Sequence, residues 1–298
     1  MNYNLVTILG PTATGKTKLA VQLADYFNGE IISADSRQVY RGMNIGTGKD
    51  LNEYFINGKQ IPFYLIDVTD PAEEFDLYKF QQMFYKSFDE LKCKNKLSFL
   101  VGGTGMYLSS ILQNYNLNKA DFETEKQILS LLPDVELKEM LKKINPALHN
   151  TTDLNDRERI IKAITIAKAQ NTHVDNTKIN SLTIGVSLSR DEIKKRITLR
   201  LKKRLDEEGM IDEVKSLLDS GVSFDKLIFF GLEYKYIALY LKGELNKNDM
   251  FQKLNSAIHS FAKRQMTWFR KMEKEGVVIN WIDGPDFNKA KELIEISL

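Results

Sequence analysis

The chain has 298 residues, of which 43% are hydrophobic and 28% are charged, and its formal net charge is only +2. This is the composition of an ordinary globular protein, and a nearly neutral chain gives no overall indication of nucleic-acid binding. No stretch approaches the roughly 18 consecutive apolar residues that a membrane span requires, and the N-terminus does not resemble a secretory signal. The single cysteine, Cys93, excludes an internal disulfide and a cysteine-based zinc site. We therefore expect a cytoplasmic protein with no membrane partner.

Short apolar runs separated by helical stretches predict a doubly wound, mostly parallel α/β sheet of the P-loop NTPase type. The predicted strands are Leu5–Leu9, Ile31–Ala34, Phe63–Ile66, Leu97–Val101, Leu182–Leu188 and Val277–Trp281. Helical periodicity is clearest over Lys18–Asn28, Leu77–Lys92, Arg190–Glu208 and Phe251–Lys274. Ligands bind such sheets at the carboxyl ends of the strands, so the residues that follow the strands are candidate site residues.

The first predicted strand leads into Gly10-Pro11-Thr12-Ala13-Thr14-Gly15-Lys16-Thr17, which fits the phosphate-loop pattern G-x-x-x-x-G-K-[ST]. A predicted helix follows at once, so the motif has the strand–loop–helix context that it needs. Backbone N–H groups of such a loop surround phosphate oxygens at the positive end of the helix. Lys16 would contact a terminal phosphate, and Thr17 would bind Mg²⁺ through its hydroxyl group. The motif is typical of nucleotide-binding and ATP-binding proteins, but it predicts only a bound pyrophosphate group and does not assign that group to ATP.

Three further predicted strands end in residues that could carry chemistry. Asp35 follows the second strand and could act as a general base or bind Mg²⁺ through water, although Asp also caps short helices well. Asp67 follows the third strand and could bind Mg²⁺, but buried strands often end in an Asp that serves as a turn residue. The fourth strand leads into Gly102-Gly103-Thr104-Gly105, which could admit a ligand close to the backbone or form a plain turn. The pattern favours a functional role for Asp35 and leaves the other two open.

The segment between the fourth and fifth strands has no convincing strand and shows helical periodicity. We predict a helical insertion over residues 113–181, with a second helix that starts near Asp153 or Asn155. Residues 1–112 and 182–298 would form the catalytic core.

Basic residues crowd two of the predicted helices that follow the insertion, at Lys194–Arg204 and at Lys263–Lys271. Such clusters could form local basic faces for a nucleic acid on a nearly neutral protein. Two solvated helix faces are the plainer interpretation of the same pattern.

Five motifs occur in a fixed order along the chain, namely Gly10–Thr17, Asp35–Tyr40, Gly42–Thr47, Gly102–Tyr107 and Ala262–Phe269. Together they resemble the tRNA dimethylallyltransferase (IPP transferase) family, whose members prenylate an adenosine beside the anticodon. The resemblance spans nearly the whole chain and is far more specific than the phosphate loop alone.

The resemblance implies transfer of a dimethylallyl group from dimethylallyl diphosphate, held on the phosphate loop, to the exocyclic N6 amine of adenosine. The lone pair of this amine is delocalised into the ring, so a base that accepts its proton makes attack feasible, and Asp35 matches the family's base. Lys16, Mg²⁺ on Thr17 and an arginine would stabilise the leaving pyrophosphate. Arg200 matches the family's phosphate-binding arginine by its place in the basic helix, with Arg196 as the alternative.

The resemblance also implies that an anticodon stem-loop is bound and that the extruded adenosine enters from the side opposite to the diphosphate. A loop base is already unpaired, so its extrusion costs less than extrusion from a duplex. The helical insertion would clasp the loop. The residues that match the family's tRNA-binding positions are Asp35, Ser36, Arg37, Gln38, Thr104, Arg159 and Lys162.

Three sites depart from the family's pattern. Lys162 stands where Arg is common, so a bidentate contact would become a point charge. Leu232 replaces the Tyr of a glycine–tyrosine pair, and Ile258-His259 replaces Thr-Arg. We expect these positions to lie away from the phosphate loop and Asp35, and so to affect tRNA contacts rather than the chemistry.

Other functions stay open on the sequence. A small-molecule or nucleoside kinase could use the same scaffold, with Asp35 binding substrate and Asp67 holding Mg²⁺, and would turn over ATP. An RNA-binding, ATP-dependent switch would change its RNA affinity without forming a covalent product. A relative that prenylates free adenine nucleotides is a further alternative, although a small acceptor needs no insertion to clasp it. Nothing in the sequence requires more than a monomer.

Overall fold

The computed structural model describes residues 3–117, 122–144, 156–169 and 177–297, and the chain divides into two compact units. The larger unit comprises Met1–Asn114 and Thr177–Leu298, and the smaller unit comprises Tyr115–Asn176. No helix within the described residues is long and apolar enough to cross a membrane.

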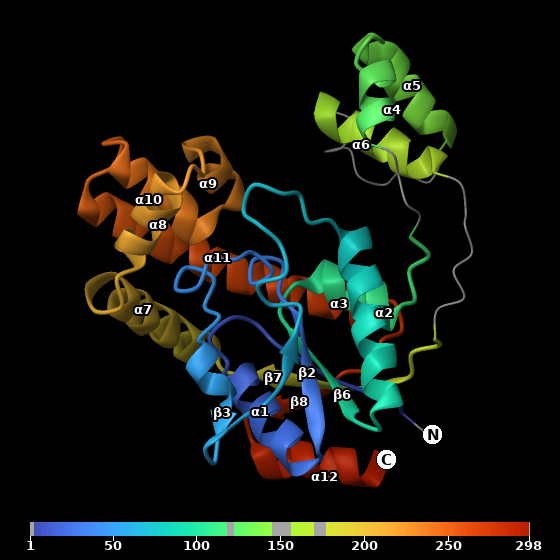
Figure 1. Ribbon diagram of the computed structural model, residues 1–298, viewed down its shortest axis with the longest axis vertical. Coiled ribbons are helices and arrows are strands. Elements are labelled where there is room, and N and C mark those ends of the chain that lie inside the picture. Colours follow the sequence, from blue (N-terminus) through green and yellow to red (C-terminus); the bar gives the residue numbers. More distant parts are fainter. Residues whose placement is uncertain (1–2, 118–121, 145–155, 170–176, 298) are drawn as a thin grey trace. The chain divides into compact units, whose positions relative to one another are not determined.

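A six-stranded sheet forms the centre of the larger unit, and all of its neighbouring strands are parallel (Figure 1). The strands are β1 (Leu5–Leu9), β2 (Gly29–Ala34), β5 (Phe63–Tyr64), β6 (Leu97–Gly102), β7 (Ser181–Ser187) and β8 (Asn280–Asp283). Their order in the sheet is β5-β2-β6-β1-β7-β8. Strands β2, β5 and β6 thus lie on one side of β1, and the later strands β7 and β8 lie on the other, with the phosphate loop at this switch point. The predicted doubly wound α/β fold is confirmed.

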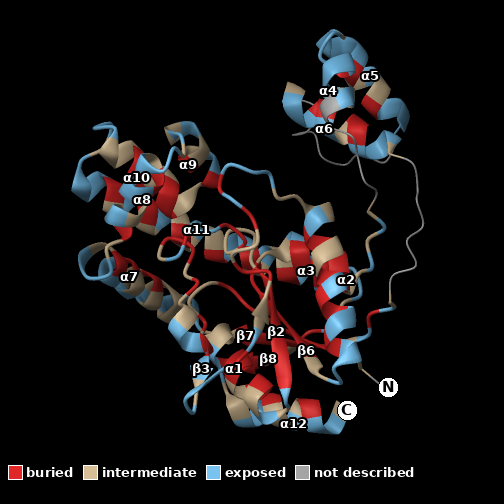
Figure 2. Cartoon of the chain, in the orientation of Figure 1, coloured by how far each residue is buried: buried red, intermediate tan, exposed pale blue. Residues whose placement is uncertain are grey.

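Helices cover both faces of this sheet, which explains why its strands are continuous apolar runs (Figure 2). One face packs against α1 (Lys16–Tyr26) and α12 (Phe287–Ser297), and the other against α2 (Leu77–Cys93), α3 (Gly105–Leu112) and α11 (Lys247–Lys274). The remaining helices of this unit are α7 (Arg190–Asp206), α8 (Met210–Asp219), α9 (Phe224–Phe230) and α10 (Leu232–Leu241). They share a core with α11 and with the loop after β2, so basic helix α7 lies against basic helix α11.

A short 3-10 helix, η1 (Leu51–Tyr54), and a two-stranded hairpin, β3 (Phe55–Ile56) and β4 (Lys59–Gln60), connect β2 to β5. Several strand bounds differ from the prediction by one to three residues, and two of these differences have a clear local cause. β5 ends at Tyr64, because Leu65 and Asp67 adopt φ values of 64° and 56°, which lie outside the range of a strand. β8 begins at Asn280 rather than Val277, whose N–H instead donates to Met272 at the end of α11. Apolar runs located both strands, but turns set their ends.

The described part of the smaller unit contains α4 (Phe122–Leu129), α5 (Asp134–Ile144) and α6 (Arg157–Lys168). Their apolar faces form a core of their own, which includes Leu137, Leu141 and Ile164. Asp156 caps α6 by accepting from two backbone N–H groups. The predicted helix starts at Asp153 and Asn155 lie outside the described residues.

Candidate active site

The phosphate loop joins β1 to α1 and lines a cavity at the carboxyl end of the sheet. Helix α1 starts directly after Gly15, whose φ of 85° lies in the left-handed region that glycine adopts without strain. The loop residues that line the cavity are Thr12, Ala13, Gly15, Lys16 and Thr17. Gly10, Pro11 and Thr14 are not among the lining residues, and Thr14 Oγ1 instead donates to the Pro11 carbonyl over 2.9 Å.

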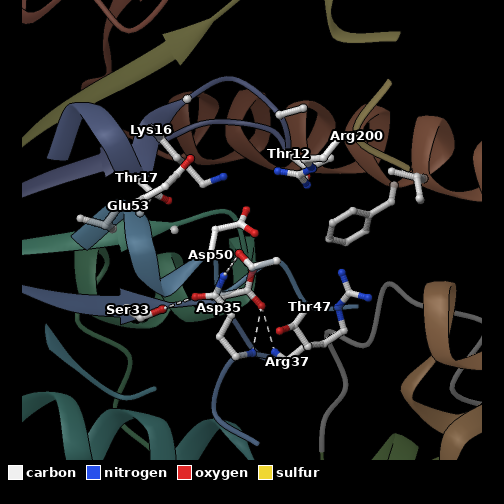
Figure 3. A pocket seen from close by; sticks show the side chains of 18 of the residues that line it. Thr12, Lys16, Thr17, Ser33, Asp35, Arg37, Thr47, Asp50, Glu53 and Arg200 are labelled. Atoms are coloured by element: carbon white, nitrogen blue, oxygen red, sulfur yellow. Dashed lines mark hydrogen bonds between the residues drawn. The ribbon is translucent and has the colours of Figure 1, made fainter. Parts of the chain in front are cut away.

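Two cations of this cavity, Lys16 and Arg200, have no carboxylate partner among the described residues (Figure 3). Arg200 donates to Thr12 Oγ1 over 2.8 Å. Burial lowers the pKa of Lys16 to about 8, and Arg200 adds to this decrease, whereas Asp35 opposes it. Burial also lowers the pKa of Arg200 to about 10, with a contribution from Arg204. A bound anion would raise both pKa values, so the cavity favours a negatively charged ligand.

The other two arginines of the cavity are neutralised within the protein. Arg37 forms an ion pair with Glu233 over 2.6 Å, and Arg204 pairs with Asp50 over 2.8 Å. Arg196, the alternative to Arg200, does not line the cavity and pairs with Glu192 over 2.7 Å. The charge available to a ligand therefore comes from Lys16 and Arg200.

Asp35 follows β2 and uses its two carboxylate oxygens differently (Figure 3). Its Oδ1 accepts from the backbone N–H groups of Arg37, over 3.0 Å, and Gln38, over 3.4 Å. Its Oδ2 receives no hydrogen bond from the part of the chain that the structure describes. The capping role and the chemical role that the sequence left as alternatives are thus compatible, because one oxygen fixes the turn and the other stays available in the cavity.

The remaining predicted residues of the larger unit lie on either side of Asp35. Gln38 lines the cavity, and its amide is oriented by Ser33 Oγ over 3.2 Å and by the Gly48 carbonyl over 3.0 Å. Ser36 and Thr104 are not lining residues; the Ser36 N–H donates to Thr104 Oγ1 over 3.0 Å. This bond joins the turn after β2 to the second glycine loop.

Gln265 on α11 connects the two glycine loops, a role that the sequence did not reveal. Its Oε1 accepts from the Thr12 N–H and its Nε2 donates to the Gly103 carbonyl, each over 2.9 Å. A Cβ atom at Gly103 would lie only 2.3 Å from Nε2, so this glycine makes room for Gln265 rather than for a ligand. The motif at residues 262–269 includes Gln265, but its two partners lie 253 and 162 residues away along the chain, so the sequence could not indicate the bridge.

The loop between β2 and η1 supplies further cavity residues that were not predicted, namely Thr47, Gly48 and Asp50, and Glu53 follows them in η1. Lys49, whose side chain is 0% exposed, fastens this loop. Its Nζ donates to the Tyr40 carbonyl over 2.6 Å and forms an ion pair with Asp67. Because Asp67 is engaged by Lys49 and does not line the cavity, the kinase interpretation loses its Mg²⁺ carboxylate.

We expect Lys49→Met to lower the free energy of unfolding by about 2–3 kcal/mol. This is less than the loss for a fully buried ion pair, because the Asp67 side chain is 36% exposed. Urea unfolding measures the change. Lys215→Met provides the control, since the Lys215–Asp212 pair is exposed on both sides and should contribute less than about 1 kcal/mol. Equal effects of the two substitutions would contradict the role of Lys49 as the anchor of the loop.

Two of the departures from the family's pattern lie at the cavity, contrary to the expectation from the sequence. Leu232 and Ile258 are lining residues, whereas His259 is not. The start of α10 and the middle of α11 both reach the carboxyl end of the sheet, which local sequence cannot reveal. These substitutions therefore change the wall of the cavity itself.

Arg159 and Lys162 lie on α6 of the smaller unit, and both are exposed. Ile160, Ile161 and Ile164 of the same helix are buried in that unit's core, so the two cations lie on the solvent side of α6. Arg159 Nε is 3.6 Å from Asp156 Oδ2, an exposed contact of little energy. Their role in tRNA binding stays a prediction.

Comparison with known proteins agrees with this architecture. The model of a family described as IPP transferase matches residues 38–272. A tRNA dimethylallyltransferase 1 from Geotalea uraniireducens is 50% identical over 305 aligned positions, covering 100% of this chain and 99% of the relative. The corresponding enzyme from Syntrophus aciditrophicus is 48% identical over 304 positions, with 100% and 99% coverage.

Solved structures show the same similarity. The crystal structure of a tRNA isopentenylpyrophosphate transferase from Bacillus halodurans is 35% identical, with a TM-score of 0.69, and covers 99% of this chain and 95% of that one. A eukaryotic dimethylallyltransferase acting on tRNA is 23% identical with a TM-score of 0.78, which establishes a shared fold. The resemblance drawn from the five motifs is confirmed: the chain belongs to the IPP transferase family.

Proposed function

We propose that this chain is a tRNA dimethylallyltransferase, which transfers a dimethylallyl group from dimethylallyl diphosphate to N6 of an adenosine next to the anticodon and releases pyrophosphate. The observation that carries the proposal is a single cavity lined by two unneutralised cations, Lys16 and Arg200, and by the Asp35 carboxylate. The names of its relatives, at about 50% identity over the full chain, support the same activity.

In this proposal the diphosphate lies on the phosphate loop, at the N-terminus of α1. Backbone N–H groups, Lys16 and Arg200 then face the oxygens on which negative charge grows as pyrophosphate leaves. Thr12 contributes by holding the Arg200 guanidinium in place through its hydroxyl group. Both cations are already partly buried before the ligand arrives, so less reorganisation is needed during the reaction.

The transfer itself forms one bond and breaks another. The N6 lone pair attacks the first carbon of the allyl group, and the bond from that carbon to the diphosphate oxygen breaks. Asp35 Oδ2 accepts the proton that N6 loses, while Oδ1 stays bonded to the turn. The oriented amide of Gln38, in the same cavity, suits recognition of an adenine edge.

The cavity also fits Mg²⁺ bound together with a diphosphate. Its oxygen groups include the Thr17 hydroxyl and the carboxylates of Asp50 and Glu53, and Mg²⁺ prefers oxygen ligands shared with substrate phosphates. The described residues contain no group of three or more His, Cys, Asp and Glu that could hold a metal alone. Thr17 would therefore hold the ion jointly with the diphosphate, where it neutralises charge on the leaving group.

The acceptor is proposed to be a tRNA anticodon stem-loop. Arg37 lines the cavity, and Ser36 follows Asp35 and bonds to Thr104. Arg159 and Lys162 are exposed cations of the smaller unit. RNA backbones are bound mainly through such basic side chains.

Incubation with labelled dimethylallyl diphosphate, Mg²⁺ and unmodified tRNA, followed by nucleoside analysis, tests the proposal. Label is expected in an N6-prenylated adenosine. Label only in free adenine nucleotides would identify a small acceptor instead. Turnover of ATP without labelled tRNA would overturn the proposal in favour of a kinase.

The affinity for dimethylallyl diphosphate is expected to fall as the pH rises above about 8, because Lys16 then loses its proton and with it the positive charge that attracts the diphosphate. Below this pH the cationic form dominates and binding is at full strength. Above it, affinity can fall by up to about tenfold per pH unit. KM values measured on both sides of pH 8 check this, and Lys16→Arg, which stays charged, should abolish the dependence. An unchanged profile in that variant would assign the titration to another group.

A further inference from the structure

A second cavity lies between α7, α11 and the end of β7, separated from the phosphate-loop cavity by α11. Ile258, Phe261 and Gln265 of α11 line the phosphate-loop cavity. His259, Lys263, Met266, Thr267 and Arg270 of the same helix line the second one. The spacing of this second set places it along one helix face, as expected for residues that share a neighbour.

The second cavity is strongly cationic. Arg190 and Lys194 of α7 line it together with Lys263 and Arg270 of α11, whereas no Asp or Glu appears among its described lining residues. None of these four cations forms an ion pair with a carboxylate within the part of the chain that the structure describes. Four positive charges thus converge without compensation.

Other basic residues of the same helices behave differently. Arg196 and Lys203 of α7 and Lys271 of α11 each lie within 4.0 Å of a glutamate. Some basic residues of the two segments are therefore neutralised, whereas Lys194, Lys263 and Arg270 face one cavity. If the two basic segments were only solvated helix faces, their unpaired cations would not be expected to line the same cavity.

The spacing of the cations and the lining of the cavity indicate which class of anion it would bind. Lys263 and Arg270 are seven positions apart on α11, which corresponds to about 10 Å along the helix axis. One phosphate group could contact both only if the two long side chains converged on it, whereas successive phosphates of a nucleic-acid strand can each contact one of them. The lining also includes the apolar side chains of Leu188, Ile193 and Met266, which suit the sugar and base edges of a strand.

We propose that this second cavity binds the phosphate backbone of the substrate RNA at nucleotides beyond the reacting adenosine. The inference rests on the proposed function, because that function supplies the RNA. It assigns a binding role to Arg190, Lys194, Lys263 and Arg270, and it locates part of the RNA-binding surface on the larger unit.

The test compares two double variants of equal charge. Lys194→Gln/Lys263→Gln removes one cation from each helix at the cavity, whereas Lys253→Gln/Lys274→Gln removes two exposed cations of α11 that do not line it. We expect the first pair of substitutions to weaken binding of unmodified tRNA about tenfold. It should also reduce the slope of log affinity against log salt by about 1.4–1.8, or 0.7–0.9 for each lost phosphate contact. The control pair should leave both quantities unchanged.

The outcomes separate the possible sources of phosphate. Weaker tRNA binding with an unchanged KM for dimethylallyl diphosphate supports the proposal. A raised KM for dimethylallyl diphosphate, or weaker binding of inorganic pyrophosphate, with unchanged tRNA affinity would overturn it in favour of a small-anion site. Equal losses in both double variants would overturn it by assigning the effect to net charge. Wild-type protein that binds tRNA with this salt dependence but forms no prenylated adenosine would refute the proposed function while leaving this inference intact.

Discussion

Replacing Asp35 with Asn is expected to lower the turnover number by about 10²–10⁴-fold, the usual contribution of a general base. The substitution keeps an Oδ1 atom that can accept from the N–H groups of Arg37 and Gln38, so the turn after β2 should survive. It removes only the oxygen that can take the N6 proton. Single-turnover measurements with labelled dimethylallyl diphosphate and tRNA separate this loss from changes in binding.

Binding of the diphosphate should change little in the same variant. Asp35 raises the pKa of Lys16, so its loss lowers that pKa further but also removes a negative charge close to the ligand. Asp67→Asn is the matched control, because it replaces a carboxylate that also follows a strand but pairs with Lys49 outside the cavity. It should reduce stability and lower the rate of transfer far less than Asp35→Asn does. Full turnover in Asp35→Asn would show that another group accepts the proton.

The parts of the site that sequence predicts well are those coded by neighbouring residues. The phosphate loop needs a strand, a glycine turn and a helix start within one short segment, and Lys16 and Thr17 line the cavity as the motif implies. The parallel sheet follows from strands that are apolar on both faces. Asp35 is also found locally, since the side chain after a strand in such a sheet points to its ligand-binding edge.

The rest of the site depends on contacts between distant segments. The buried Lys49 could not be distinguished from a surface lysine, because its partners Tyr40 and Asp67 become neighbours only when the loop after β2 folds onto the end of β5. Leu232 and Ile258 were expected to lie away from the chemistry, yet α10 and α11 carry them to the cavity wall. Periodicity identifies the buried face of a helix but does not say whether that face meets a core or a ligand.

Gln265→Met is expected to lower kcat/KM by about 10²-fold, although Gln265 itself need not touch a reacting atom. Its amide fixes the Thr12 N–H and the Gly103 carbonyl together, and Thr12 in turn holds Arg200. Methionine has a similar volume but cannot bond to either group. A shift of about 1 Å in such a framework is sufficient for a loss of this size.

A matched substitution distinguishes positioning from plain stability. Gln81 is also buried, at 1% exposure, and its Nε2 donates to the Ser110 carbonyl outside the cavity. Gln265→Met and Gln81→Met should each lower the free energy of unfolding by about 1–3 kcal/mol, the cost of leaving buried polar groups unpaired. At a temperature where both variants are folded, only Gln265→Met should reduce kcat/KM. If both variants kept wild-type kcat/KM, the bridge between the two glycine loops would serve the fold alone. The bridge joins the loop that binds the diphosphate to the loop beside Asp35. We therefore expect it to set the distance over which the allyl group is transferred.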